Sequence, residues 1–385
     1  MEKTNTKTWI TLAPVFFGFF IMGLVDVVGI SANYVKTDFS LSRTWASFLP
    51  LMAFIGFAFL AVPSGILMNK IGRKNTVLLS MAITCIALFI PSFGYTFGGM
   101  ITTFALIGIG NTLMQTSLNP LMGNVVSGRL LTTSLTLGQF FRSSSSFLGP
   151  VLVTLIAAAT GNWRDIFPLY AGITLVAGLW LLVTGIRKEP VERTSKNSFA
   201  STFLLLKNPR LAILFFSLFI YVGIDVGMNV YVPQFLETQC GVPLEKAVLG
   251  SSLYFIARIV GSFTGAFLLY RMPSGKVWLW TMVLAVITTG ILLPMHSAWI
   301  VSGLVLVIGF TCANVFPIIF SFALNEVPER ANEVSGLLIM AVSGGAVVPW
   351  LMGGLNDHIS PVAGFYLLWL CFALLLFVSM RWRHR

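Results

Sequence analysis

The sequence predicts an all-α integral membrane protein with twelve transmembrane helices in two six-helix repeats. Three observations lead to this prediction: the overall hydropathy, the length of the apolar runs, and landmarks that recur about 200 residues apart. Of the 385 residues, 56% are hydrophobic and only 10% are charged, and the mean hydropathy is +0.89. A soluble protein of this size could not bury so much apolar material in its core.

The apolar runs are near 20 residues long and lack the two-residue alternation of membrane β-strands, so each predicts a helix that crosses the bilayer. We expect these helices at about residues 9–31, 44–68, 75–93, 97–122, 131–158, 166–186, 211–236, 247–270, 277–295, 298–324, 334–355 and 362–380. The connections are short except for a charged stretch at 187–210. The prediction is therefore an N-terminal bundle at 1–186, a cytoplasmic linker at 187–210 and a C-terminal bundle at 211–385.

Landmarks of the first half recur in the second half in the same order. The pairs are Asp26 and Asp225 (199 residues apart), Gly65 and Gly265 (200), Pro120 and Pro317 (197), and Pro150 and Pro349 (199). The near-constant spacing indicates duplication of a six-helix unit. Transporter folds built from such repeats bind substrate near the midplane between the halves and rock one half against the other.

The net charge of +11 follows membrane topology and does not call for a nucleic-acid partner. With the N-terminus inside, two of the 24 Lys and Arg residues lie within helices and 18 in cytoplasmic segments, and the four in outer loops are Lys36, Arg43, Arg164 and Lys246. This asymmetry obeys the positive-inside rule and predicts a multi-pass protein with both termini in the cytoplasm. We expect a monomer in a bacterial-type inner (plasma) membrane, in contact with lipid. The four cysteines show no metal-ligand spacing, and neither a metal nor a cofactor is expected.

Asp26 places a carboxylate in the middle of the first apolar run, within Gly23-Leu-Val-Asp-Val-Val-Gly29, and Asp225 has the equivalent place in the second half. A charge at the bilayer centre costs about 2.5 kcal/mol or more, so such an acid indicates a functional site. An acid that moves between an apolar environment and a neighbouring arginine would bind and release a proton. The alternative is a permanently paired or protonated acid that only orders the helices.

Arg142 and Arg258 are the two basic residues inside predicted helices, each near mid-depth. A guanidinium group binds a carboxylate through two hydrogen bonds, so one interpretation is recognition of an anionic substrate such as a sialic or uronic acid. In the other interpretation, Arg142 pairs with Asp26 and Arg258 pairs with Asp225. The sequence leaves both open.

The stretch Gly65-Ile-Leu-Met-Asn-Lys-Ile-Gly-Arg-Lys74 resembles the inner-loop signature of the major facilitator superfamily, G-x-x-x-D-R-x-G-R-[RK]. Asn69 replaces the usual Asp and Lys70 the usual Arg. The resemblance implies a conformational latch at the inner face of the N-terminal half, formed by Gly65, Asn69, Lys70, Gly72 and Arg73. A plain basic inner loop is the alternative.

Five further stretches resemble helix motifs of the fucose and proton symporter family within that superfamily. They are Gln115-Thr-Ser-Leu-Asn-Pro120, Leu137-Gly-Gln-Phe-Phe-Arg-Ser143, Tyr221-Val-Gly-Ile-Asp-Val-Gly227, Phe316-Pro-Ile-Ile-Phe320 and Met340-Ala-Val-Ser-Gly-Gly-Ala-Val-Val-Pro349. The resemblance implies import of a sugar or sugar acid by symport with protons, or with sodium in some members. The family's proton-binding acid maps onto Asp26, whereas its second acid falls on Gln115 and its asparagine near the sugar falls on Arg142.

Neutral amide side chains at mid-depth are the candidate sugar contacts, because amides offer both donors and acceptors to hydroxyl groups. They are Gln115, Asn119, Gln139, Asn229 and Asn314. Hydrogen bonding between helices is the alternative role for each. Tyrosines such as Tyr254 could stack on a sugar ring.

Two other functions fit parts of the sequence. Gly149-Pro150 resembles motifs of proton-coupled exporters of drugs or metabolites, but the many amides within the helices favour uptake of a polar solute. Two membrane acids would also suit an intramembrane aspartyl protease. Such enzymes need a G-x-G-D type stretch and a paired Tyr-Asp, which the contexts of Asp26 and Asp225 do not match, so no catalytic residue is expected.

Overall fold

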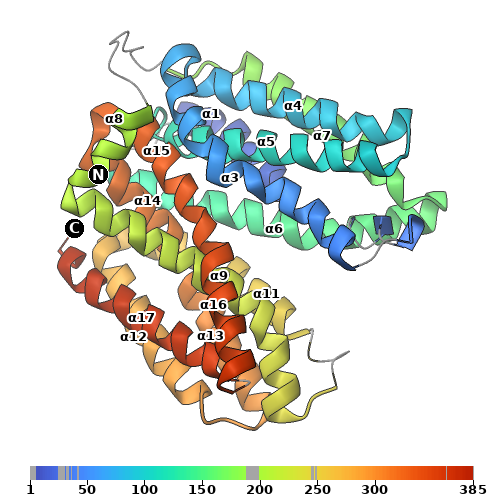
Figure 1. Ribbon diagram of the computed structural model, residues 1–385. Helices are drawn as coiled ribbons and strands as arrows, with labels where there is room; N and C mark the ends of the chain where they lie inside the picture. The colour runs from blue at the N-terminus through green and yellow to red at the C-terminus, as the bar shows by residue number, and fades with distance from the viewer. Residues whose placement is uncertain are drawn as a thin grey trace. The chain divides into compact units, whose positions relative to one another are not determined.

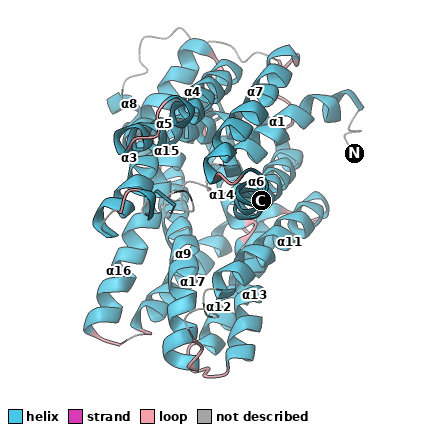
Figure 2. Ribbon diagram, turned by 90° about the vertical axis from the view of Figure 1, so that its right-hand side faces the viewer, coloured by secondary structure: helices cyan, strands magenta, loops and turns pink. Residues whose placement is uncertain are grey.

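The computed structural model describes residues 6–24, 31, 34–35, 37–40, 43–187, 199–243, 247, 249–360 and 362–384 (Figure 1). These residues are almost entirely helical and contain no strand (Figure 2). Among the described residues, ten helical stretches are long and apolar enough to cross a membrane, counting Ala298–Glu326 and Pro328–His358 as one stretch each, and two shorter apolar helices cover Trp9–Leu24 and Gly56–Ile71. This inventory agrees with the twelve predicted membrane helices.

The first six predicted helices are present; the described part of the first ends at Leu24, where residue 31 was expected, and the limits of the other five differ by a few residues. They are α1 (Thr6–Leu24), α3 (Arg43–Ile71), α4 (Arg73–Phe93), α5 (Phe97–Met122), α6 (Gly128–Thr160) and α7 (Ile166–Val183). Asp26 follows the last described residue of α1 and lies outside the described residues. The short α8 (Phe199–Phe203) comes from the predicted linker, of which residues 188–198 are also outside them.

The second half continues with helices that match the remaining predicted spans. They are α9 (Pro209–Cys240), α11 (Leu249–Arg271), α12 (Ser274–Leu292), α13 (Ala298–Cys312), α14 (Val315–Glu326), α15 (Ala331–Met340), α16 (Gly344–His358) and α17 (Ala363–Trp382).

Two spans predicted as single helices, 298–324 and 334–355, are interrupted. The first breaks at Ala313–Asn314, between α13 and α14, and the second passes through a 3-10 turn at Ala341–Ser343. Asparagine and serine are weak helix formers because their side chains compete for backbone hydrogen bonds. Discontinuous membrane helices are typical of substrate and ion sites in transporters.

The chain forms two compact units, and each includes a segment from the other half of the sequence. The first unit comprises Met1–Ser127, Phe141–Leu204 and Glu329–Met340, and the second comprises Gly128–Phe140, Leu205–Pro328 and Ala341–Arg385. The exchanged segments are the first part of α6 and helix α15. They are the beginnings of the fifth and eleventh predicted spans, which are equivalent under the 200-residue repeat. The predicted division at 187–210 stays a prediction.

In the first unit, α4 packs against α5 and α7, while α3 packs against α5 and α15 (Figure 1). In the second unit, α9 contacts α11, α14, α16 and α17. Large side chains such as Trp278, Tyr254 and Phe320 are completely buried there. Other large apolar side chains, including Trp299 and Trp350, are exposed, as expected for surfaces that face lipid.

Candidate functional site

Asp225 and Arg258 form an ion pair inside the second unit. Arg258 Nη1 on α11 donates to Asp225 Oδ2 on α9 at 2.6 Å, and both side chains are largely buried. The Tyr254 hydroxyl donates to the other carboxylate oxygen, Oδ1, at 2.7 Å. Both carboxylate oxygens therefore have a partner, as a buried charge requires. The sequence anticipated the pairing as one of two alternatives for Arg258.

The ion pair lies where α11 contacts the broken span α13–α14. A β-carbon on Gly309 of α13 would lie only 2.6 Å from the Tyr254 carbonyl oxygen, so the two backbones are in direct contact there. The Tyr221 hydroxyl donates to the carbonyl oxygen of Cys312, at the end of α13, at 2.8 Å. These contacts connect α9, which carries Asp225, and α11, which carries Arg258, to the break between α13 and α14.

Sequence reasoning missed Tyr254 as a partner of Asp225 and treated it only as a stacking candidate. Its position four residues before Arg258 was the available signal, because residues four apart share one face of a helix. Arg258 Nε is buried and has no partner among the described residues, so one donor of the guanidinium remains unused in this arrangement.

Gln115 and Asn119 lie one turn apart on α5 in the first unit, and both are at most 3% exposed. Asn119 Nδ2 donates to the Gln115 carbonyl oxygen at 2.8 Å, while Asn119 Oδ1 has no partner in the described part of the chain. The Gln115 side chain makes no hydrogen bond with the described residues. These amides keep hydrogen-bonding capacity for water or substrate.

Helix α6 carries Gln139 and Arg142. Gln139 is 4% exposed and Arg142 is half-buried, and neither side chain has a hydrogen bond or ion pair with any residue the structure describes. Gly23 of α1 packs directly on α6, because a β-carbon there would collide with the Arg142 carbonyl oxygen. Ser146 Oγ joins the two helices, donating to Arg142 O at 3.0 Å and lying 3.4 Å from Gly23 O.

Asn314 and Asn229 differ in their surroundings within the second unit. The Asn314 side chain occupies the space that a β-carbon on Gly265 would need, and its Nδ2 donates to Gly261 O at 3.2 Å. This geometry favours the alternative of hydrogen bonding between helices. Asn229 is half-buried, and its backbone carbonyl oxygen accepts a hydrogen bond from Ser251 Oγ at 2.7 Å.

The residues of the predicted latch surround the junction of α3 and α4. Gly72 has φ of 87°, a left-handed conformation that favours glycine, and it precedes α4 as the N-cap. Arg73 Nη1 donates to Pro120 O at 3.1 Å and to Asn124 Oδ1 at 2.5 Å, which ties the start of α4 to the end of α5. Lys70 is exposed.

Asn332 on α15 is the partner that sequence reasoning did not find. Arg73 Nε donates to Asn332 Oδ1 at 2.7 Å, and Asn332 Nδ2 donates to Asn69 Oδ1 at 2.6 Å. Gly65 allows this approach, because a β-carbon there would lie 2.7 Å from Asn332 O. The repeat gives no signal for this contact: it pairs Asn332 with Thr132, whose hydroxyl bonds Ser321 at 2.7 Å, and Ser321 is not the repeat equivalent of Asn69 or Arg73.

Substitutions in this network should change stability in opposite directions. Asn332→Ala removes the partners of Arg73 Nε and Asn69 and is expected to lower the free energy of unfolding by about 1–3 kcal/mol. Asn69→Asp is expected to raise it, because Asn69 Nδ2 is buried without a described partner and a carboxylate would add attraction to the Arg73 network. Thermal unfolding in detergent measures both, with Lys276→Ala, an exposed position on α12, as the neutral control. Equal stability of Asn332→Ala and the unsubstituted protein would contradict the latch.

The fold and these sites define a multi-pass helical membrane carrier with polar residues inside its apolar helices. The chain belongs to the Major Facilitator Superfamily, whose model matches residues 15–349. Its family membership and its all-helical fold are therefore as predicted. Because this is a superfamily of transporters, the protein is a transporter and not an enzyme, and the aspartyl protease interpretation is set aside.

Named relatives span almost the whole chain. The glucose/galactose transporter of Brucella abortus biovar 1 (strain 9-941) is 25% identical over 401 residues, covering 98% of this chain and 96% of the relative. The putative glucose/galactose transporter of Helicobacter pylori (strain 26695) is 24% identical over 385 residues, covering 94% and 92%.

Solved structures agree in fold. The fucose:proton symporter FucP of Escherichia coli superposes with a TM-score of 0.85 at 17% identity, covering 98% of this chain and 99% of that one. The proton:xylose symporter XylE superposes with a TM-score of 0.75 at 15% identity, covering 98% and 96%.

Proposed function

We propose that this protein imports a sugar or a sugar-derived, acidic solute by symport with a cation, through alternating access. The proton is the proposed coupling ion and sodium is the alternative. The names of the relatives support this assignment: one is a glucose/galactose transporter, another is named a putative one, and two structural neighbours are symporters of protons with fucose or xylose. We also propose a monomer in the inner membrane, with both termini cytoplasmic and no nucleic-acid partner or cofactor.

The observation that carries the proposal is a set of polar side chains, on the helices that bear the family motifs, that have no described partner. They are Gln115, Gln139 and Arg142. Amide and guanidinium groups that bond no described residue are open to hydrogen bonds with water or substrate. Amides and a guanidinium can satisfy the hydroxyls, and the carboxylate, of a sugar acid.

Asp26 is the proposed proton carrier, and Arg142 is its proposed partner when substrate is absent. Gly23 packs against Arg142 through the backbone, and Asp26 follows Gly23 by three residues. An acid that alternates between an arginine and an apolar environment takes up and releases a proton.

The substrate class can be tested with purified protein in liposomes. We expect an inward proton gradient to accelerate uptake of a labelled sugar or sugar acid. In exchange of labelled for unlabelled substrate, which needs no net proton transfer, Arg142→Gln should slow exchange of sugar acids by about tenfold or more, since it removes a charged hydrogen-bond partner, and should spare neutral hexoses. Arg129→Gln, an exposed position on the same helix, is the control.

Competition between neutral hexoses and sugar acids, measured in the same assay, shows whether the substrate is an anion. If neutral hexoses compete with a sugar acid as well as other sugar acids do, anion recognition by Arg142 is refuted. Transport of hydrophobic drugs in the outward direction, without uptake of any sugar, would replace the import proposal with the exporter alternative.

A further inference from the structure

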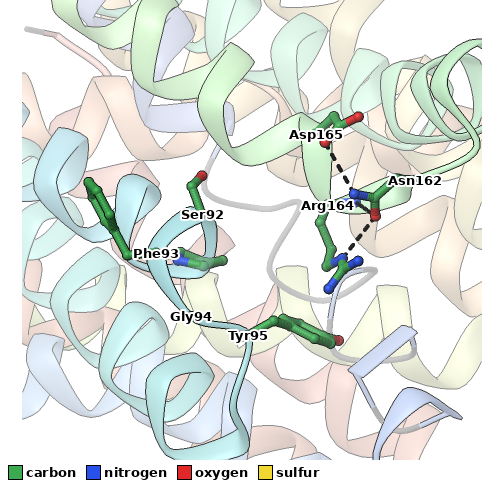
Figure 3. Close-up of a pocket in the computed structure, with 8 residues that line it drawn as sticks. Ser92, Phe93, Gly94, Tyr95, Asn162, Arg164 and Asp165 are labelled. Carbon is green, nitrogen blue, oxygen red and sulfur yellow. Dashed lines mark hydrogen bonds between the residues drawn. The ribbon is translucent and has the colours of Figure 1, made fainter.

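A polar cavity lies at one end of the first unit, between the connection from α4 to α5 and the turn after α6 (Figure 3). Its volume is about 380 Å³, and the lining residues include Ser92, Tyr95, Asn162, Arg164 and Asp165. Both connections lie on the outer side of the membrane in the predicted topology. The cavity involves none of the substrate candidates described above.

Asn162 fixes the orientation of the two charged residues of this cavity. Its Oδ1 accepts hydrogen bonds from Arg164 Nε at 2.9 Å and from the Arg164 backbone N–H at 3.2 Å. Its Nδ2 donates to Asp165 Oδ1 at 3.2 Å. Figure 3 shows the Asn162 amide between the two charged side chains, with the Arg164 guanidinium extending toward Tyr95. One amide thus holds a positive and a negative group in fixed positions beside the cavity.

Tyr95 and Trp163 form a supporting layer anchored by Asp38. Asp38 Oδ2 accepts from the Tyr95 hydroxyl at 2.7 Å and from Trp163 Nε1 at 3.1 Å. Burial and the neighbouring Asp38 carboxylate raise the pKa of Tyr95, so its hydroxyl remains a donor at physiological pH. The Arg164 guanidinium carbon lies 4.6 Å from the centre of the Tyr95 ring, a cation–π distance. Arg164 is therefore positioned by an amide on one side and an aromatic ring on the other.

Hydrogen-bonding groups in the cavity remain available. Among the described residues, the Nη groups of Arg164, Oδ2 of Asp165 and the hydroxyl of Ser92 have no partner. Neighbouring hydroxyls of a polyol can donate to a carboxylate and accept from a guanidinium at the same time. With Asp38 nearby, carboxylates outnumber the guanidinium, which disfavours an anion, and Arg164 disfavours a simple cation. The volume falls within the range of about 300–1,000 Å³ typical of small-molecule sites.

We propose that this cavity is an outer binding site for a neutral saccharide, in which Arg164 and Asp165 bind the hydroxyl groups and Asn162 positions both. The inference rests on the proposed function, because sugar transport supplies the class of ligand. It adds a second saccharide site at the outer ends of the first-unit helices. This site shares no residue with the proposed substrate site, which contains Gln115 and Gln139.

Equilibrium dialysis of the purified full-length protein with labelled D-glucose and D-galactose tests the proposal. We expect two classes of sites in the unsubstituted protein. Arg164→Gln and Asp165→Asn should each weaken one class by about tenfold or more, because each removes a charged hydrogen-bond partner. Gln115→Leu should weaken the other class and leave the outer class unchanged. Thermal unfolding of each variant shows whether it remains folded. If one of the two outer variants, Arg164→Gln or Asp165→Asn, fails to fold, the other still tests the site.

The outcomes separate this proposal from the proposed function. A single class of sites that Gln115→Leu weakens and both outer substitutions spare refutes the outer site and leaves sugar transport intact. Absence of binding of either hexose to the unsubstituted protein refutes the outer site, and it contradicts the proposed function as well if a labelled sugar acid also fails to bind. Binding of labelled glycine that Asp165→Asn abolishes, without saccharide binding there, would assign the cavity to zwitterions and overturn the saccharide assignment.

Discussion

Asp225→Asn is expected to lower the free energy of unfolding by about 3–5 kcal/mol, because it leaves the Arg258 guanidinium buried without its counter-charge. The Tyr254 hydroxyl would also lose its charged acceptor. Thermal or denaturant unfolding in detergent measures the loss. Tyr254→Phe keeps the ion pair and should cost less, about 1.5–3 kcal/mol for one hydrogen bond to a charged group.

The double variant Asp225→Asn/Arg258→Met distinguishes a structural ion pair from a proton-coupling site. Replacing a buried ion pair by apolar groups is often neutral or stabilising, so the double variant should recover most of the stability lost in Asp225→Asn. An Asp225→Asn protein that is as stable as the unsubstituted protein, but whose uptake no longer depends on pH, would instead assign Asp225 to proton coupling.

Asp26→Asn is expected to abolish accumulation of sugar against its gradient, because an amide cannot carry the proton that drives uptake. Exchange of labelled for unlabelled sugar across the membrane should be less affected, since exchange requires the substrate site and its movement but no net proton transfer. Paired measurements of gradient-driven uptake and of exchange, in the same liposomes, give both results.

Glu237→Gln provides the matched control for Asp26→Asn. It makes the same exchange of acid for amide at an exposed position near the end of α9, and it should leave both activities unchanged. Uptake by the unsubstituted protein that is indifferent to both pH and sodium would refute cation coupling altogether.

Hydropathy predicted the number and approximate limits of the membrane helices, because the length of an apolar run is set by the thickness of the bilayer. The same signal could not locate the breaks at Ala313–Asn314 and Ala341–Ser343. A hydropathy window averages over these residues. The break at Asn314 depends on contacts with another helix, since its amide occupies the space beside Gly265 and bonds Gly261.

The sequence predicted which residues make up the candidate sites better than it predicted which of them bond one another. Depth along a helix follows from residue number, so the mid-depth acids, arginines and amides could be identified. The rotation of each helix and its choice of neighbour do not follow from residue number, so Tyr254 was missed as a partner of Asp225 and Asn332 as a partner of Arg73. The roles of Asp26 and of the unpaired amides stay predictions.

The bond between Arg73 and Asn332 also constrains the order of events during biosynthesis. The two residues are 259 positions apart, so the N-terminal six helices leave the ribosome long before their α15 partner exists. Until then Asn69 and Arg73 lack the partners that join them in the finished protein. The first unit is therefore completed only when the eleventh span has been inserted into the membrane.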